Sequence, residues 1–108
     1  MEITFEEFQK IEMRVGTILK AEKFNTRKPA IKLEIDFGEL GVKKSSAQIT
    51  ELYKPEELIG RQVIAVMNFP PKQIADLLSE VLVLGIVQGE EVILLTGERK
   101  AINGARIA

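Results

Sequence analysis

Residues 30–37 alternate strictly between apolar and polar side chains, and this pattern limits the fold more than any other feature of the chain. In the sequence AIKLEIDF every second residue from Ile31 to Phe37 is apolar, and Lys, Glu and Asp fill the positions between them. Side chains of a β-strand point alternately to its two faces, so a period of two gives one apolar and one polar face. The stretch therefore predicts a strand with one face in a core and the other in water.

Five other stretches are rich in β-branched and apolar residues and are bounded by turn residues, which is typical of further strands. They predict strands over residues 14–24, 42–49, 61–69, 79–87 and 90–97. Gly16, inside the first of them, predicts a bend or a bulge. Hairpin turns are expected at residues 38–41 and at Gln88 and Gly89. Residues 72–78 follow two prolines, and we expect a loop with a helical turn there.

Two short helices are predicted outside the strands. Thr4 and Glu7 form a capping box, and the apolar residues that follow recur at helical spacing. The apolar face of this N-terminal helix needs a partner, and the sequence leaves two open: the protein's own core or a second copy of the chain. Residues 50–60 carry Pro55 at a first helical position and Gly60 at the end, which indicates a second helical turn.

This order of elements predicts an all-β fold with a small helical content. The best match is an OB-fold antiparallel Greek-key barrel with a short N-terminal helix and a helical turn between strands 3 and 4. The chain of 108 residues is long enough for one hydrophobic core, so we expect a single domain over residues 1–108. The OB topology places ligand contacts on its second and third strands.

The later strands are apolar on both alternating faces, notably in residues 63–69 and 81–87. The outer face of a strand in a small barrel is normally wet, so these strands need additional cover. A second copy of the chain supplies it most simply, and we predict a homodimer. The alternative is that the N-terminal helix covers this surface within one chain.

The polar run KKSSAQIT at residues 43–50 lies in the predicted third strand, where a binding face is expected. Lys43 and Lys44 point to opposite faces of a strand, with Ser45 on the side of Lys43 and with Ser46 and Gln48 on the side of Lys44. Hydroxyl and amide groups hydrogen-bond phosphate, a ribose 2′-hydroxyl or a peptide backbone equally well. The run therefore indicates a polar, extended ligand and leaves its class open.

Charge is divided unevenly along the chain although its formal net charge is only -1. Residues 14–54 contain nine Lys and Arg against five acids, a balance of +4, whereas residues 55–98 contain two against seven, a balance of -5. Such a division gives a surface that attracts phosphate in one part and repels it in another. An ordinary mixed surface explains the same numbers.

The chain contains no histidine and no cysteine, which removes the commonest general base, the thiolate nucleophile and the nitrogen and sulfur metal ligands. It also has no glycine-rich phosphate loop, and its paired carboxylates are neighbours in sequence that diverge on a helix or strand. We therefore predict a protein that is not an enzyme and uses no cofactor. The longest apolar run is too short to insert into a membrane, and a cytoplasmic location is expected.

Five segments, spread in order over nearly the whole chain, resemble the tRNA-binding OB domain that is appended to methionyl- and other tRNA synthetases and also occurs as free-standing dimers. They read IEMRVGTI (11–18), KLEIDFG (32–38), SSAQIT (45–50), LIGRQVIAVMNFPP (58–71) and SEVLVLG (79–85). Within that family, the SSAQIT and NFPP…SEVLVLG segments resemble those of the CsaA-type secretion chaperones.

The resemblance implies a homodimer that binds unfolded or pre-secretory polypeptides, with tRNA and secretion translocase components as further possible partners. Carried over by position, it implies a ligand-binding surface of eleven residues: Arg14, Lys32, Lys43, Ser45, Ser46, Gln48, Asn68, Phe69, Lys72, Ser79 and Glu80. Three interpretations stay open at this point. One is an export chaperone, and another is a free-standing tRNA-binding protein that contacts the folded tRNA backbone; these two functions can coexist. The third is a purely structural accessory subunit that binds neither ligand.

Overall fold

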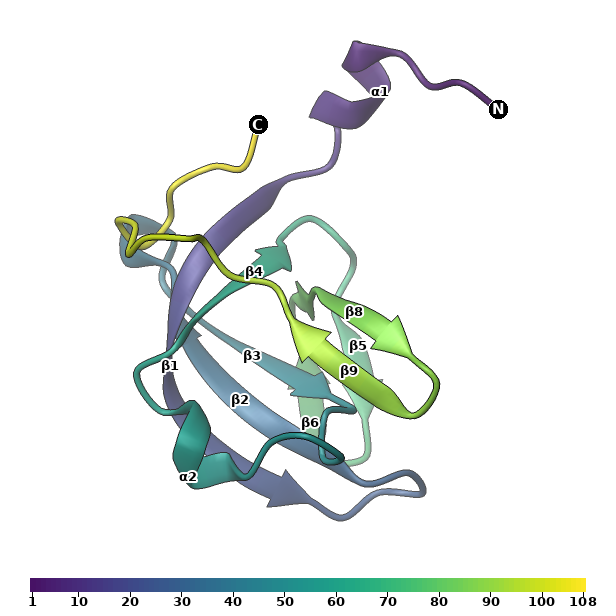
Figure 1. Ribbon diagram of the computed structural model, residues 1–108, viewed down its shortest axis with the longest axis vertical. Helices are drawn as coiled ribbons and strands as arrows, with labels where there is room; N and C mark the ends of the chain where they lie inside the picture. Colours follow the sequence, from purple (N-terminus) through teal and green to yellow (C-terminus); the bar gives the residue numbers. More distant parts are fainter.

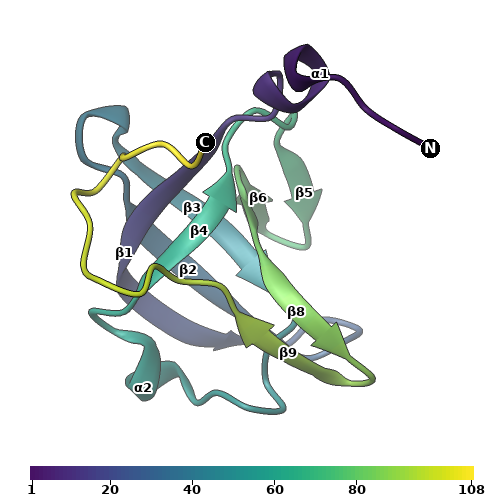
Figure 2. The ribbon, with the colours of Figure 1, turned by 45° about the horizontal axis from the view of Figure 1, so that its top comes forward.

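The computed structural model describes all 108 residues, and most of its strands form a curled antiparallel sheet of the OB type, as predicted (Figure 1). The sheet has the order β3-β2-β1-β4-β7. Its strands are β1 (Met13–Phe24), β2 (Ala30–Asp36), β3 (Val42–Ala47), β4 (Gln62–Val66) and β7 (Leu82–Val83). Two hairpins complete the barrel: β5 (Lys72–Ile74) with β6 (Leu77–Ser79), and β8 (Gly85–Gln88) with β9 (Glu91–Leu94). Figures 1 and 2 show both hairpins on the side of the barrel away from β1.

Strand β2 forms the centre of the core, and its alternating pattern is confirmed. Its apolar side chains Ile31, Leu33 and Ile35 are buried, whereas the charged residues between them are partly exposed. The strand pairs with β1 on one edge and with β3 on the other, both antiparallel. A 3-10 turn (Gly38–Leu40) connects β2 to β3, which confirms the predicted hairpin turn.

The predicted bend at Gly16 is wrong in its position. The register between β1 and β2 shifts between Ile18 and Lys20, so the bulge lies beyond the glycine. Gly16 has a different role, because a Cβ there would lie 2.7 Å from side-chain atoms of both Ile35 and Phe37. The glycine lets β1 approach the core residues of β2 closely, and the strand curves farther along.

The structure also corrects the predictions for two later segments. Residues 72–78 form the β5–β6 hairpin rather than a loop with a helical turn, and Ala75 adopts a left-handed conformation (φ 52°) at its tip. The predicted strand 79–87 is divided into β7, which pairs with β4, and β8, which pairs with β9. The break lies before Gly85, where a Cβ would meet Val92 Cγ1 at 2.5 Å and prevent the hairpin from closing.

The predicted capping box is present in helix α1 (Phe5–Gln9), but the helix stays at the surface of its own chain, where Arg106 Nη2 donates to Gln9 O (3.2 Å). The Glu7 backbone N–H donates to Thr4 Oγ1 (3.1 Å), and the Thr4 N–H donates to Glu7 Oε1 (3.0 Å). No residue of the helix is buried, and Figures 1 and 2 show α1 beyond the end of the barrel. The alternatives in which α1 packs on the core or covers the later strands within one chain are therefore wrong. Its predicted dimer contact stays a prediction.

Helix α2 (Pro55–Leu58) forms at the predicted place, between β3 and β4, with Pro55 in its first turn and Leu58 fully buried. Neither helix has the length and the apolar character that crossing a membrane requires. The C-terminal segment, which no pattern predicted, runs beside β1. The Val15 N–H donates to Ala105 O (3.0 Å), and the Ile107 N–H donates to Met13 O (3.0 Å).

Candidate ligand-binding groove

The free edge of β3 is covered by residues 79–81, which we call the closing segment. The Glu80 N–H donates to Lys44 O (2.8 Å), and the Lys44 N–H donates to Glu80 Oε1 (3.0 Å). The Ser46 N–H donates to Ser79 Oγ (3.2 Å). Side chains of the closing segment thus accept the N–H groups that a neighbouring strand would otherwise accept.

Ser45 belongs to this connection and not to a ligand surface. Its side chain is fully buried, and its hydroxyl donates to Val81 O at 2.8 Å. A buried hydroxyl is tolerated when it has such a partner. The structure therefore does not bring Ser45 to the surface that the sequence assigned to it, because the hydroxyl is used to hold the closing segment on β3.

An open groove lies beside this connection, between β3, the loop after β4 and the β5–β6 hairpin. Its main cavity has a volume of about 420 Å³. The cavity is lined by Ser46, Phe69, Pro70, Lys72, Ile74, Ser79, Glu80, Val81 and Leu82. A second cavity of about 290 Å³ shares three of these residues and extends the groove past Gln48. The groove thus brings together six of the eleven predicted residues: Ser46, Gln48, Phe69, Lys72, Ser79 and Glu80.

The walls of this groove are mainly apolar, with few charges. Phe69 and Leu82 are about half exposed, at 54% and 48%. Lys72 is the one cation that lines the main cavity, and the carboxylate of Glu80 already accepts a backbone N–H from β3. Such a surface suits apolar side chains of a ligand better than a row of phosphates.

Asn68 and Arg14, which the sequence also placed on the ligand surface, hold neighbouring segments of the chain together. The Asn68 side chain accepts from the Glu12 N–H (3.0 Å) and donates to Lys10 O (2.6 Å). The Arg14 guanidinium donates to Gly104 O (3.1 Å) and to Glu12 Oε1 (2.9 Å). Both residues therefore lie outside the groove and fix the two ends of the chain against the barrel.

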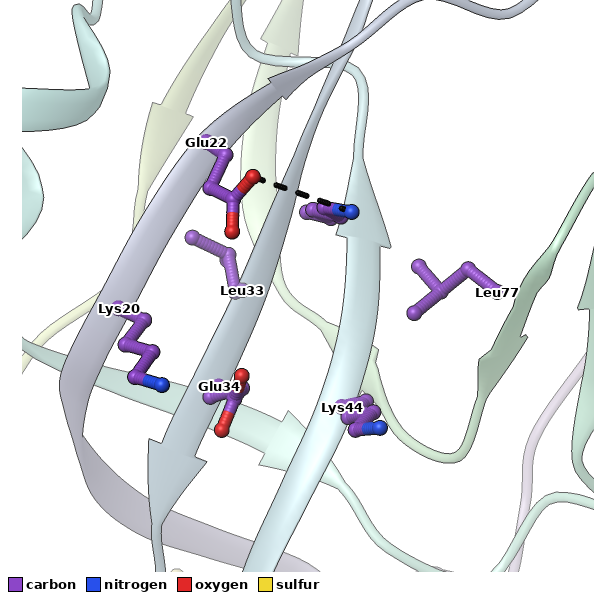
Figure 3. A pocket seen from close by; sticks show the side chains of 7 residues that line it. Lys20, Glu22, Leu33, Glu34, Lys44 and Leu77 are labelled. Carbon is purple, nitrogen blue, oxygen red and sulfur yellow. Dashed lines mark ion pairs between the residues drawn. The ribbon is translucent and has the colours of Figure 1, made fainter.

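Lys32 lines a shallow charged cavity together with Lys20, Glu22, Glu34 and Lys44, which come from β1, β2 and β3 and form a charged face. Figure 3 shows these neighbours of Lys32. Its Nζ is 3.9 Å from Glu22 Oε2. In the strand register Glu34 lies between Lys20 and Lys44, so carboxylates and amines alternate across the strands. Each lysine of this face has a neighbouring carboxylate, which weakens its attraction for an external anion. Lys43 points the other way, toward the core face, and is partly buried.

Sequence reasoning missed the apolar residues Ile74 and Leu82, which line both cavities of the groove. Ile74 was missed because residues 72–78 were interpreted as a loop, so no wall was expected on that side. Leu82 was missed because residues 79–87 were interpreted as one continuous strand, which is in fact divided into β7 and β8. The available signal was weak: two three-residue strands around Ala75 and Asp76 give too short a pattern to be recognised as a hairpin.

Comparison with known proteins places this arrangement in a family. The family model described as "Putative tRNA binding domain" matches residues 13–106. The crystal structure of the chaperone CsaA from Bacillus anthracis str. Ames is 53% identical, covers 100% of both chains and superposes with a TM-score of 0.96. The CsaA chaperone protein from Picrophilus torridus is 52% identical, covers 99% of this chain and 100% of its own, and has a TM-score of 0.92.

Similar sequences also occur as part of much longer proteins. The methionine–tRNA ligase of Methanococcoides burtonii is 36% identical over 106 residues, which is 97% of this chain. The chain spans only 16% of the length of that ligase.

Proposed function

Because this chain belongs to the tRNA-binding domain family, we propose that it is a non-catalytic binding protein of the cytoplasm that holds unfolded or pre-secretory polypeptides in the groove beside β3. The groove itself carries the proposal, since it is open, elongated and mainly apolar. The similarity to two CsaA chaperones supports the same ligand class. Contact with secretion translocase components stays an expectation from the resemblance.

The hydrogen bonding at β3 defines how a polypeptide enters this groove. A peptide that pairs with a strand edge needs free backbone N–H groups on that edge. Here the N–H groups of Lys44 and Ser46 are already taken by the closing segment. The ligand therefore docks through its side chains, against Phe69 and Leu82, rather than as an added strand.

Binding of a permanently unfolded polypeptide tests this function. The probe is reduced, carboxymethylated and fluorescently labelled α-lactalbumin, measured by anisotropy at low and at moderate salt. Affinity should hold or rise with salt, because apolar burial is not screened. The double variant Phe69→Ser, Leu82→Ser should bind about thirtyfold more weakly, since each of the two changes removes about 1 kcal/mol of apolar contact.

A matched control uses two apolar residues of similar exposure outside the groove. Leu19 is 46% exposed and Ile59 is 50% exposed, and neither lines the groove. The double variant Leu19→Ser, Ile59→Ser should bind like the wild type. Equal losses of affinity in both double variants, or no binding by the wild type, would contradict the proposal that the groove binds polypeptides.

We further propose that two copies associate through α1. Ile3 and Phe5 are 61% and 69% exposed, and an apolar face of this kind normally has a partner. Sedimentation velocity should give a dimer for the wild type and a monomer for Phe5→Ser. A monomeric wild type at about 100 μM, a concentration at which an affinity of about 1 μM gives a dimer, would contradict it.

Binding of tRNA is the second candidate function, and a specific observation favours it. Lys23, Arg27, Lys28 and Lys54 lie at or beside the turn between β1 and β2, and none of them forms an ion pair. Contacts of these side chains with phosphate should weaken steeply as salt rises. The salt dependence thus separates tRNA binding from polypeptide binding in the same assay.

A further inference from the structure

A separate cavity of about 450 Å³ opens between the turn after β1 and the segment that leads into α2. Its rim and walls include Lys23, Asn25, Pro29, Thr50, Tyr53 and Lys54. None of these residues lines the groove's main cavity, and none belongs to the eleven-residue ligand surface that the resemblance implied. The volume lies within the range of pockets that hold small organic ligands.

The residues that line this cavity carry positive charge and no negative charge. Lys23 and Lys54 line it, and no carboxylate does. Arg27 and Lys28 lie on the same turn, and none of these four cations forms an ion pair. Unpaired cations at a concave surface concentrate anions. A phosphate group is therefore the chemistry that this rim favours.

An aromatic ring held in a fixed position forms part of the same wall. The Tyr53 hydroxyl accepts a hydrogen bond from the Leu94 N–H at 3.1 Å. The Arg61 guanidinium carbon lies 5.7 Å from the centroid of the Tyr53 ring. The ring also packs on the hydrophobic core, so it is fixed before a ligand binds, and a flat ligand group in the cavity contacts the part of the ring that lines it. Nucleobases pack on such rings whatever their sequence.

We propose that this cavity binds one nucleotide of a single-stranded RNA segment, with its phosphate at Lys23 and Lys54 and its base against Tyr53. The inference deepens the second candidate function, because it names the place where an RNA contacts this chain. It differs from polypeptide binding in ligand, in position and in the residues used. The charged face of β1, β2 and β3 lacks these features, since its lysines have carboxylate neighbours and no aromatic ring lines its cavity.

Amide shifts in a ¹⁵N-labelled sample, titrated with adenosine monophosphate, test the site directly. The nucleotide should shift the amides of residues 23–25 and 50–54. The double variant Lys23→Gln, Lys54→Gln should bind it about tenfold more weakly, because two charge-assisted contacts are lost. The matched control Lys20→Gln, Lys44→Gln removes the same charge from the charged face and should bind like the wild type.

Two further titrations separate the contribution of the phosphate to the affinity from that of the base. Inorganic phosphate and a phosphoserine peptide should each bind more weakly than adenosine monophosphate, because neither offers a base to Tyr53. Tyr53→Leu should reduce nucleotide affinity to that of phosphate, and Tyr53→Phe, which keeps the ring, should not. Equal binding of all three probes, or equal losses in the two lysine variants, would overturn the proposal. Shifts confined to other parts of the barrel would also overturn it.

The same samples, titrated with bulk tRNA, test the nucleotide site separately from tRNA binding, the candidate function on which the proposal rests. If tRNA does not bind but the nucleotide still shifts these amides, tRNA binding is wrong and the nucleotide site stands. If tRNA binds equally well to the wild type and to Lys23→Gln, Lys54→Gln while the nucleotide does not bind, the site is wrong and tRNA binding stands.

Discussion

The two edges of β3 are held in different ways. On one edge β3 pairs with β2 as a regular antiparallel ladder, from Ile31 opposite Ala47 to Asp36 opposite Val42. On the other edge the side chains of Ser79 and Glu80 accept N–H groups of β3, and the Ser45 hydroxyl donates to Val81 O. The first edge therefore depends on backbone geometry and core packing, and the second depends on the identity of a few polar side chains.

This difference explains the polar run in an otherwise apolar strand. Ser45 is required where the barrel closes, whereas Lys44 and Ser46 contribute mainly their backbone N–H groups to the same connection. The side chain of Ser46 is then free to line the groove. One stretch thus supplies both the closure of the barrel and one wall of the binding site.

Gly16→Val should have the largest effect on the free energy of unfolding, because it disturbs the core packing that supports the regular β-ladders. A Cβ at this position would lie 2.7 Å from Ile35 and Phe37, which are fully buried. Overpacking of this kind should lower the free energy of unfolding by about 3 kcal/mol. Urea denaturation measures it, with Lys20→Val on the same strand as a control that should change it by less than about 0.5 kcal/mol. Equal changes in unfolding free energy in the two variants would mean that the stability of the barrel does not depend on the close approach of β1.

Ser45→Ala should have an intermediate effect, because it acts on the closing edge. The change leaves the Val81 carbonyl without its partner and should cost about 1–2 kcal/mol of unfolding free energy. Ser46→Ala is the matched control on the same strand, since no hydrogen bond uses its hydroxyl. It should cost less than about 0.5 kcal/mol. If the two serines behave alike, the hydroxyl bond does not hold the closing segment.

Glu80 sharpens the comparison further, because one of its substitutions keeps an acceptor. Glu80→Ala removes the acceptor of the Lys44 N–H, and Glu80→Gln retains a side-chain oxygen at that place. Loss of about 1 kcal/mol should raise the hydrogen-exchange rate of the Lys44 amide by roughly fivefold to tenfold in the alanine variant. The glutamine variant should exchange like the wild type. A fast-exchanging Lys44 amide in the wild type would contradict the closing role of Glu80.

The ladder side of the barrel could be predicted from the sequence, and the closing side could not. Strand β2 has a period of two that is long enough to recognise, and α2 carries proline at its start and glycine after its end. The closing bonds join residues that are 33 to 36 positions apart through single side chains, and such bonds leave no periodic pattern. The family resemblance placed the serines and Glu80 on a ligand surface, but no pattern in the sequence indicated that Ser45 holds the closing segment.

The binding sites could be predicted only in part, because contacts between residues that are distant in sequence leave no periodic pattern. Residues close to β3 converge on the groove, whereas Asn68 and Arg14 are used to tie the chain ends to the barrel. The cavity near Tyr53 was not expected at all. It is formed by two segments that are about 25 residues apart, and only the fold brings Lys23 and Lys54 to one rim.

Thr4→Ala should have the smallest effect on the stability of the barrel. The change removes the capping box of α1, which costs about 1 kcal/mol of local helix stability. No residue of α1 is buried in its own chain, so the cost does not add to the unfolding free energy of a dilute, monomeric sample. Hydrogen exchange of the α1 amides should rise while denaturation of the barrel stays unchanged.

Protein concentration then decides whether α1 acts within one chain or between two. If the helix joins two copies, Thr4→Ala should weaken the dimer by up to about thirtyfold, because each of the two helices has lost about 1 kcal/mol of stability that association must restore. The effect on stability should therefore appear as the concentration rises and be absent at high dilution. A loss of barrel stability that is independent of concentration would place the partner of α1 within its own chain, against the exposure of its apolar face.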